Sequence, residues 1–259
     1  SNPRAKLPVA LPLKRCATPP NLMDTTTNQL AQAFVSGLKR ILGEKLHGVY
    51  IYGAAAFPDA VPSRDIDYHV ILTSELTESE RAELEAFHDS LAVEYPPLGA
   101  EMDGYYILLA DAQRATPPRS QMWTRATDDS WALHREHIRA GRHIVLHGPD
   151  PTQIYPPASW PELESALYGE LDFVKKHLHD HPDYCILNLC RLIYSFQTKN
   201  VVISKAQASD WTSNTHPQWK PLIEAAKKSY AAQATPKDHH LMRAEIEALL
   251  EFTQNRIQR

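Results

Sequence analysis

The sequence of 259 residues lacks the features that mark several specialised classes of protein. Its three cysteines (Cys16, Cys185 and Cys190) are odd in number and without metal-ligand spacing, which argues against a disulfide framework. No apolar run approaches the roughly 20 residues that span a bilayer. The net charge of −4 includes no surplus of the basic residues typical of nucleic-acid-binding proteins. We therefore expect a globular cytoplasmic protein that binds neither membranes nor nucleic acids, with a monomer favoured.

The chain changes in character near residue 150. Residues 1–23 are basic and proline-rich without an uninterrupted apolar segment, which predicts a flexible tail and not a secretory signal. Residues 24–150 alternate helical patterns with short apolar runs, which predicts an α/β domain with a mixed sheet. From Trp160 onward the strand signal almost disappears, so residues 151–259 are predicted to form an all-α helical bundle.

Apolar runs and helix signals locate the expected elements. Strands are predicted in HGVYIYG (47–53), DIDYHVIL (65–72), EMDGYYILLA (101–110) and HIVLHG (143–148). A capping-box signature, Thr77 with Glu80, predicts a helix from about 78 to 93. Further helical patterns begin near Thr25 and at about 128–141, 161–179, 183–199, 204–210, 217–232 and 237–257. Cys185 and Cys190 fall inside one of these patterns and are predicted to be buried free thiols.

Asp65 and Asp67 stand two positions apart inside the second apolar run. Side chains alternate across a strand, so the two carboxylates share one face, about 6–7 Å apart. Like charges at this distance repel and raise one pKa unless a cation neutralises them. Mg²⁺, which takes carboxylates together with substrate phosphates, is the simplest neutraliser. An exposed edge strand with two solvated aspartates explains the spacing as well.

The neighbouring strands bring further groups to the same place. Gly53 ends the preceding strand and is followed by small residues that can start a helix, where free N–H groups bind phosphates. The third strand carries Asp103, with Glu101 two residues earlier on the same face. Together these residues predict a site for a metal-bound triphosphate, with in-line attack on phosphorus assisted by a carboxylate base. The sequence does not decide between Glu101 and Asp103 as the third acid.

Two motifs in this order resemble a known family. Gly53–Ala54 followed by Asp65-Ile66-Asp67 is similar to the Gly-Ser and Asp-x-Asp signature of nucleotidyltransferases of the DNA polymerase beta type. NLCRLIYSFQTKNVVISKAQASDW, followed by PLIEAAKKSY, resembles the helical domain of the streptomycin/spectinomycin adenylyltransferases. The resemblance covers roughly residues 28–232. It implies transfer of AMP from ATP to a hydroxyl of an aminoglycoside or aminocyclitol, and hence antibiotic resistance.

The resemblance also implies roles for individual residues. Three acids would hold Mg²⁺, and one of them would also deprotonate the acceptor hydroxyl: Asp65, Asp67 and, in both roles, Asp103. The residues implied in ATP binding are Gly53, Ala54, Arg191, Lys205 and Tyr230. Without the resemblance, Arg191 and Lys205 would be interpreted as surface charges and Tyr230 as a core residue.

The acceptor is less well defined by the sequence. The acids that contact antibiotics in the family are not matched, and Asp180, Asp183 and Tyr184 occupy that neighbourhood instead. Trp123 could serve as a platform for a sugar or cationic ring. Glu170 and Asp172 could, with Asp180 and Asp183, attract a cationic acceptor or simply form solvated helix faces.

Two departures from the family pattern leave another function open. The serine of Gly-Ser is Ala54 here, which removes a hydroxyl contact of about 1 kcal/mol, and a bulky Arg64 precedes Asp65. A catalytically decayed nucleotide-binding or regulatory module of the same fold is therefore the alternative. A metal-dependent phosphohydrolase is a second one, although His134, His137 and His143 are predicted to be surface or capping residues.

Overall fold

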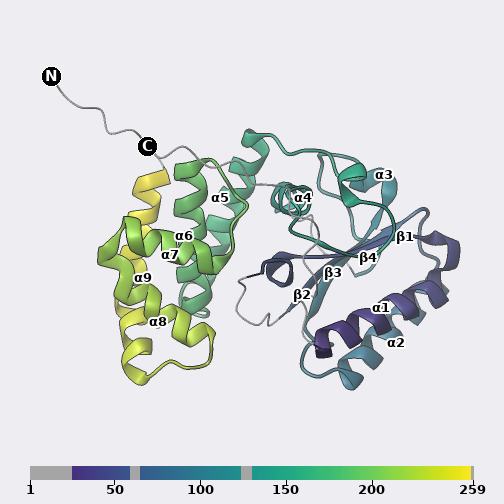
Figure 1. The fold of residues 1–259 in the computed structure, drawn as a ribbon, viewed down its shortest axis with the longest axis horizontal. Helices are drawn as coiled ribbons and strands as arrows, with labels where there is room; N and C mark the ends of the chain where they lie inside the picture. Colours follow the sequence, from purple (N-terminus) through teal and green to yellow (C-terminus); the bar gives the residue numbers. More distant parts are fainter. Residues whose placement is uncertain (1–24, 59–64, 124–129, 258–259) are drawn as a thin grey trace.

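The computed structural model describes residues 25–58, 65–123 and 130–257, which form two lobes (Figure 1). The first lobe contains a mixed sheet with helices, and the second consists of helices, so the predicted fold class is confirmed. The tail predicted at 1–23 and Arg64 lie outside the described residues. Within the described ranges, no helix has the length and apolar character needed to cross a bilayer.

The sheet has four strands in the order β3-β2-β1-β4. Strand β1 pairs antiparallel with both β2 and β4, whereas β2 and β3 run parallel. The third strand ends earlier than predicted, because Leu109 and Ala112 stand at helical spacing and pack against one core cluster as part of α3. The strands are β1 (Leu46–Tyr52), β2 (Ile66–Leu72), β3 (Met102–Leu108) and β4 (Ile144–His147).

Helices α1 and α2 cover one face of the sheet (Figure 1). Phe34 of α1 packs there with its ring centroid 4.8 Å from that of Tyr68 on β2. Helix α2 begins at the predicted capping box, in which the Thr77 hydroxyl accepts a hydrogen bond from the Glu80 N–H and the Glu80 carboxylate accepts one from the Thr77 N–H. The bounds are α1 (Thr25–Leu42) and α2 (Glu78–Glu94).

The opposite face of the sheet carries the odd-numbered side chains of β2, to which Asp67 belongs. Tyr50, Ile71 and Trp131 belong to the buried cluster on this face. Helix α4 lies between the sheet and the second lobe (Figure 1). The alternation therefore directs Asp67 toward α4 and the helical lobe, away from α1 and α2. The two short helices here are α3 (Leu109–Ala112) and α4 (Trp131–Arg139).

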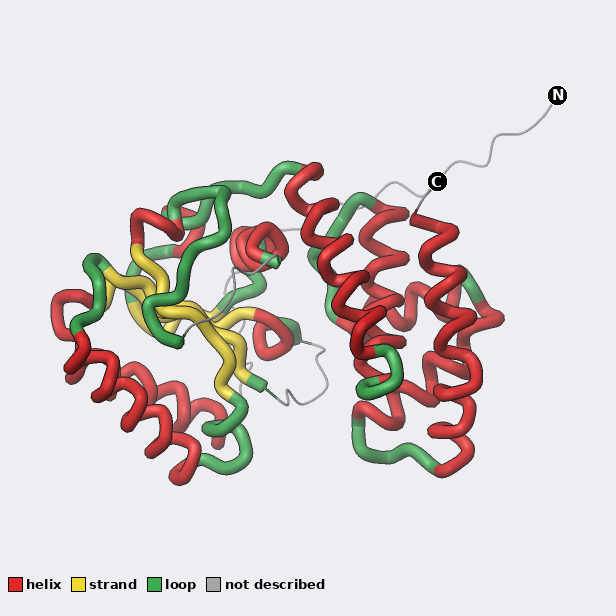
Figure 2. Tube along the Cα trace, turned by 180° about the vertical axis from the view of Figure 1, so that it is seen from behind, coloured by secondary structure: helices red, strands yellow, loops and turns green. Residues whose placement is uncertain are grey.

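The second lobe consists of helices joined by loops (Figure 2). Their buried side chains form a separate core. Cys185 and Cys190 are buried free thiols there, as predicted. The helix predicted at 204–210 continues to Thr215, two residues before Pro217. The helices are α5 (Trp160–His177), α6 (Pro182–Thr198), α7 (Lys205–Thr215), α8 (Lys220–Tyr230) and α9 (Pro236–Ile257). Single 3-10 turns stand at Gly43–Lys45, Gly53–Ala56, Pro151–Gln153 and Pro217–Trp219.

Candidate active site

A cavity of about 820 Å³ lies between the aspartate face of the sheet and the helical lobe. Ligand sites commonly measure about 300–1,000 Å³, so this one is large enough for a nucleotide. Residues of β1, β2, β3 and α4 form one wall, and residues of α5 to α8 form the other. Ten of the metal, ATP and acceptor candidates named from the sequence line it: Gly53, Ala54, Asp65, Asp67, Asp103, Glu170, Tyr184, Arg191, Lys205 and Tyr230.

Three carboxylates reach the cavity from the sheet lobe. In the strand register Asp67 stands opposite Asp103 of β3, and Asp65 lies two residues before it. Burial raises the pKa of Asp67 to about 8, and the negative charges of Asp65 and Asp103 contribute to the rise. Lys205 and Arg191, from the helical lobe, act in the opposite direction. The repulsion expected from the Asp-x-Asp spacing is therefore present in the folded chain.

Gly53 makes room for Asp67 at the end of β1. Its φ of +68° lies in the left-handed region, which glycine adopts without strain. A Cβ atom at this position would overlap the Asp67 carboxylate. The small residues after it form a single 3-10 turn, which closes with a hydrogen bond of 3.1 Å from the Phe57 N–H to the Ala54 carbonyl. The missing side chain thus allows the turn and the carboxylate to lie against each other.

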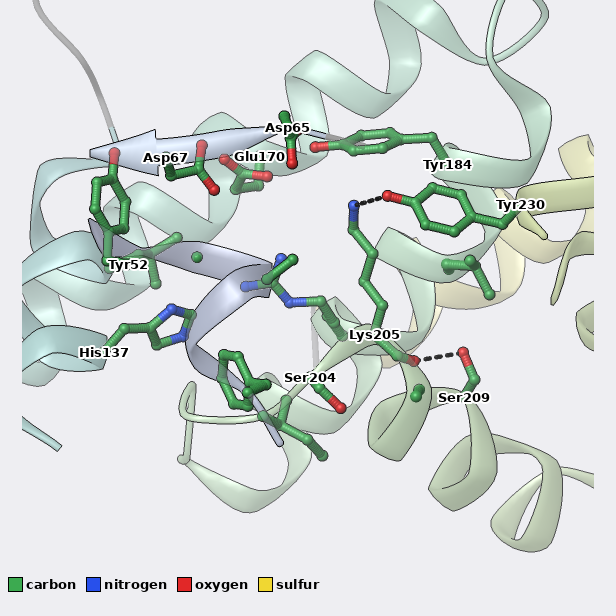
Figure 3. Close-up of a pocket in the computed structure, with 18 of the residues that line it drawn as sticks. Tyr52, Asp65, Asp67, His137, Glu170, Tyr184, Ser204, Lys205, Ser209 and Tyr230 are labelled. Atoms are coloured by element: carbon green, nitrogen blue, oxygen red, sulfur yellow. Dashed lines mark hydrogen bonds between the residues drawn. The ribbon is translucent and has the colours of Figure 1, made fainter. Parts of the chain in front are cut away.

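Lys205 begins α7 and extends its ammonium group into the cavity (Figure 3). The Nζ atom donates a hydrogen bond of 3.3 Å to the Tyr230 hydroxyl and lies 4.1 Å from the centre of the Tyr184 ring. The negative face of an aromatic ring attracts a cation at this distance. Burial and the nearby charge of Arg191 lower the pKa of Lys205 to about 8, while Asp65 and Asp67 favour its charged form.

Arg191 of α6 adds a second cation to the same wall. Among the residues that the structure describes, its guanidinium group has neither a hydrogen-bonding partner nor an ion-pair partner. Its charge nevertheless acts on Lys205 and Tyr184. The planar fork of N–H donors in arginine matches the geometry of phosphate oxygens. One wall of the cavity therefore presents carboxylates and the other presents cations.

Comparisons with known proteins show what this chain is similar to. Residues 153–256 match the family described as Aminoglycoside adenylyltransferase, C-terminal domain. The chain is 21% identical to a spectinomycin 9-adenylyltransferase of Campylobacter jejuni over 254 residues, which cover 89% of this chain and 95% of that protein. The helical domain of the chain thus matches an aminoglycoside adenylyltransferase model, and most of the chain is similar to an enzyme of that kind. The resemblance described from the sequence motifs is thereby confirmed.

A solved structure shares the fold of this chain. The crystal structure of spectinomycin adenyltransferase AAD(9) from Enterococcus faecialis with ATP and spectinomycin matches it with a TM-score of 0.71. The match covers 90% of this chain and 99% of the other, at 15% sequence identity. The α+β domain followed by a helical domain is therefore common to both proteins.

The carboxylates of the cavity suit a hard divalent cation shared with a substrate. Asp65 and Asp67 offer only oxygen atoms, and a cation would offset the burial and the repulsion that together raise the pKa of Asp67. Within residues 25–58, 65–123 and 130–257, no three His, Cys, Asp or Glu side chains form a ready-made metal cage. Mg²⁺ commonly binds one or two carboxylates and takes its other ligands from phosphates and water. The aspartate pair fits that mode of binding.

Three of the predicted acceptor-binding residues do not line the cavity. Trp123 packs near α2 on the opposite face of the sheet, with its ring centroid 5.2 Å from that of His88. Asp183 joins the start of α6 to α8, because its carboxylate accepts a hydrogen bond of 3.0 Å from the Ser229 hydroxyl. Asp180 is exposed in the turn before α6. Of the acceptor candidates, Tyr184 and Glu170 line the cavity.

Two cavity residues make contacts that the sequence did not predict. Glu170 of α5 lies at the cavity, where the buried Asn188 donates a hydrogen bond of 2.9 Å to its carboxylate. The surface or capping position predicted for His137 is wrong, since this side chain is only 6% exposed and its Nε2 atom lies 2.8 Å from the Val201 carbonyl. Both contacts join segments far apart in the chain, so no local spacing could have indicated them.

Proposed function

We propose that this enzyme transfers AMP from ATP to a hydroxyl group of a small cationic acceptor of the aminocyclitol or aminoglycoside class. The acceptor oxygen attacks the α-phosphorus, the bond between that phosphorus and the bridging oxygen of the β-phosphate breaks, and pyrophosphate leaves. The main support is the arrangement of three carboxylates facing two cations across one cavity. A nucleotide triphosphate with a divalent ion has the charges that complement both walls.

Individual residues have distinct parts in this reaction. Arg191 and Lys205 bind the phosphates, and Tyr184 and Tyr230 hold the Lys205 ammonium group in place. Asp65 and Asp67, with Asp103 as a third acid, would hold Mg²⁺, which neutralises charge on the phosphates when bound. Asp103, on an exposed position of β3, takes the proton of the attacking hydroxyl as a general base.

The acceptor would bind beside Glu170 and Phe173, which stand at helical spacing on α5 and both line the cavity. The Phe173 ring is 44% exposed and offers an apolar surface to a saturated ring. Asn188 fixes the Glu170 carboxylate with its hydrogen bond of 2.9 Å, so that the free oxygen can accept a hydrogen bond from an ammonium group. These two side chains support a cyclic acceptor that carries an amine.

We expect Glu170→Gln to raise KM for the acceptor and to leave KM for ATP within about twofold. A hydrogen bond between charged groups contributes about 1.5–3 kcal/mol, or roughly 10- to 150-fold in binding. Steady-state kinetics with each substrate varied in turn measure both constants. Asp172→Asn is the matched control, because Asp172 lies on the same helix but pairs with Lys175 at 2.8 Å outside the cavity. Equal effects on both substrates would contradict the assignment of Glu170.

The proposed activity is tested in two steps. Calorimetry with ATP and Mg²⁺ should show binding at one site per chain. Release of pyrophosphate should then depend on an acceptor from a panel that includes spectinomycin, streptomycin and other aminoglycosides. Binding of ATP without turnover for any acceptor would favour the regulatory module. Release of inorganic phosphate without an acceptor would favour a phosphohydrolase.

A further inference from the structure

Helix α4 contributes to the cores of both lobes. Trp131 and Ile138 belong to the buried cluster on the aspartate face of the sheet, whereas Ala132 and Leu133 belong to the core of the helical lobe. Figure 1 shows the helix between the two lobes. A residue on this helix can therefore transmit the position of one cavity wall to the other.

His137, on α4, contacts the loop before α7. Its Nε2 atom lies 2.8 Å from the carbonyl oxygen of Val201. A carbonyl oxygen can only accept a hydrogen bond, so Nε2 carries the proton and donates. Burial, helped by the positive charge of Arg191, lowers the pKa of His137 to about 3. The ring is therefore neutral at any pH at which the enzyme would work, and the hydrogen bond does not depend on its titration.

The Val201 carbonyl lies four residues before Lys205, in the loop that leads into α7. The same oxygen accepts a hydrogen bond of 3.0 Å from the N–H of Ile203. The Ser204 hydroxyl then caps α7 by accepting a hydrogen bond of 3.0 Å from the N–H of Gln207. Because Lys205 is the first residue of that helix, a shift of the loop would move the lysine side chain relative to the aspartates.

We propose that His137 is a positioning residue: its hydrogen bond to Val201 sets where the Lys205 ammonium group stands across the cavity from Asp65 and Asp67. This inference rests on the proposed function, in which Lys205 binds the phosphates of ATP. His137 lies on the sheet side of the cavity and acts on Lys205 only through the loop before α7. It differs in this from Tyr184 and Tyr230, which contact the ammonium group directly.

A double-mutant cycle on ATP binding tests the inference. His137→Phe keeps an aromatic ring beside Phe57 but removes the donor, and we expect it to weaken ATP binding about five- to tenfold. His137→Gln retains an N–H donor and should recover most of the affinity. In a Lys205→Met background, His137→Phe should cause no further loss, because residues that act through one group are not additive. Calorimetry gives the four dissociation constants.

His143→Leu is the matched control. His143 also contacts a carbonyl oxygen, with Nδ1 2.7 Å from that of Ile138, but it does not reach the loop before α7. The His143→Leu substitution should change the dissociation constant of ATP by less than twofold. His137→Leu serves as a second variant should His137→Phe fail to fold.

The outcomes separate the two proposals. ATP binding by the unsubstituted protein, with losses that simply add in the cycle, would overturn the inference and leave the proposed function standing. An equal loss in His137→Gln and His137→Phe would overturn it as well. Absence of ATP binding by the unsubstituted protein would overturn the proposed function and the inference together.

Discussion

An Asp67→Asn variant is expected to lose adenylyl transfer while unfolding at a higher temperature than the unsubstituted protein. Asparagine keeps the size of the side chain but lacks the charge that, with Asp65, would hold the cation and the nucleotide. Removing one group that stabilises charge in a transition state costs about 10²–10³-fold in rate. Pyrophosphate release at saturating ATP and acceptor should fall at least that far.

The gain in stability follows from the pKa of Asp67. Folding raises this pKa to about 8 from the ordinary value of 3.8. The folded chain therefore retains a proton that the unfolded chain has released, and stability is lost as the pH rises from about 4 through about 8. Asparagine has no proton to lose. With a chelator present, the advantage of the variant should be absent near pH 4 and largest above pH 8, where a gain of about 1 kcal/mol would raise Tm by about 2–4 °C.

Asp89→Asn provides the matched control for both measurements. Asp89 is exposed on α2, which covers the far face of the sheet, so the loss of one negative charge there should alter neither the rate nor the Tm noticeably. An Asp67→Asn variant that keeps more than a tenth of the rate would contradict a role for Asp67 in holding the metal and nucleotide. A Tm at pH 9 below that of the unsubstituted protein would contradict the raised pKa of Asp67.

Local patterns in the sequence determined most of the fold. The capping box of Thr77 and Glu80 correctly located the start of α2, because both of its hydrogen bonds lie within four residues. Asp65 and Asp67 both line the cavity, as the alternation expected of a strand predicts, although β2 begins only at Ile66. Lys205 and Tyr230 were found only through motif resemblance, since nothing in their own neighbourhood indicates a shared cavity.

The residues that were missed depend on how the two lobes meet. Trp123 was proposed to bind the acceptor, but it packs beside His88 on the opposite face of the sheet. The sequence does not say which face of the sheet its loop covers. Glu170 and Asp172 are two residues apart and equally acidic, yet only Glu170 faces the cavity, because α5 turns the other outward. Such choices follow from tertiary packing, which a single sequence does not reveal.

Asp103 and Glu101 are the two acids between which the sequence could not decide. We expect Asp103→Asn to lower kcat far more than Glu101→Gln does. Asp103 stands opposite Asp67 in the register and lines the cavity. Glu101 precedes β3, where its carbonyl accepts a hydrogen bond of 3.0 Å from the Ile66 N–H, and its exposed side chain lies outside the cavity. A positioned general base contributes about 10²–10⁴-fold to a rate. We expect a loss of that size for Asp103→Asn and a change within twofold for Glu101→Gln.

The kinetic constants can also separate the two roles of Asp103. A residue that only takes the proton of the acceptor hydroxyl acts in the chemical step, so its loss would reduce kcat and leave ATP affinity intact. A residue that also holds the metal would, when lost, weaken ATP binding in the presence of Mg²⁺ but not in a chelator. Calorimetry on Asp103→Asn under both conditions distinguishes these cases. Wild-type kcat in this variant, together with a large loss in Glu101→Gln, would exclude Asp103 from either role.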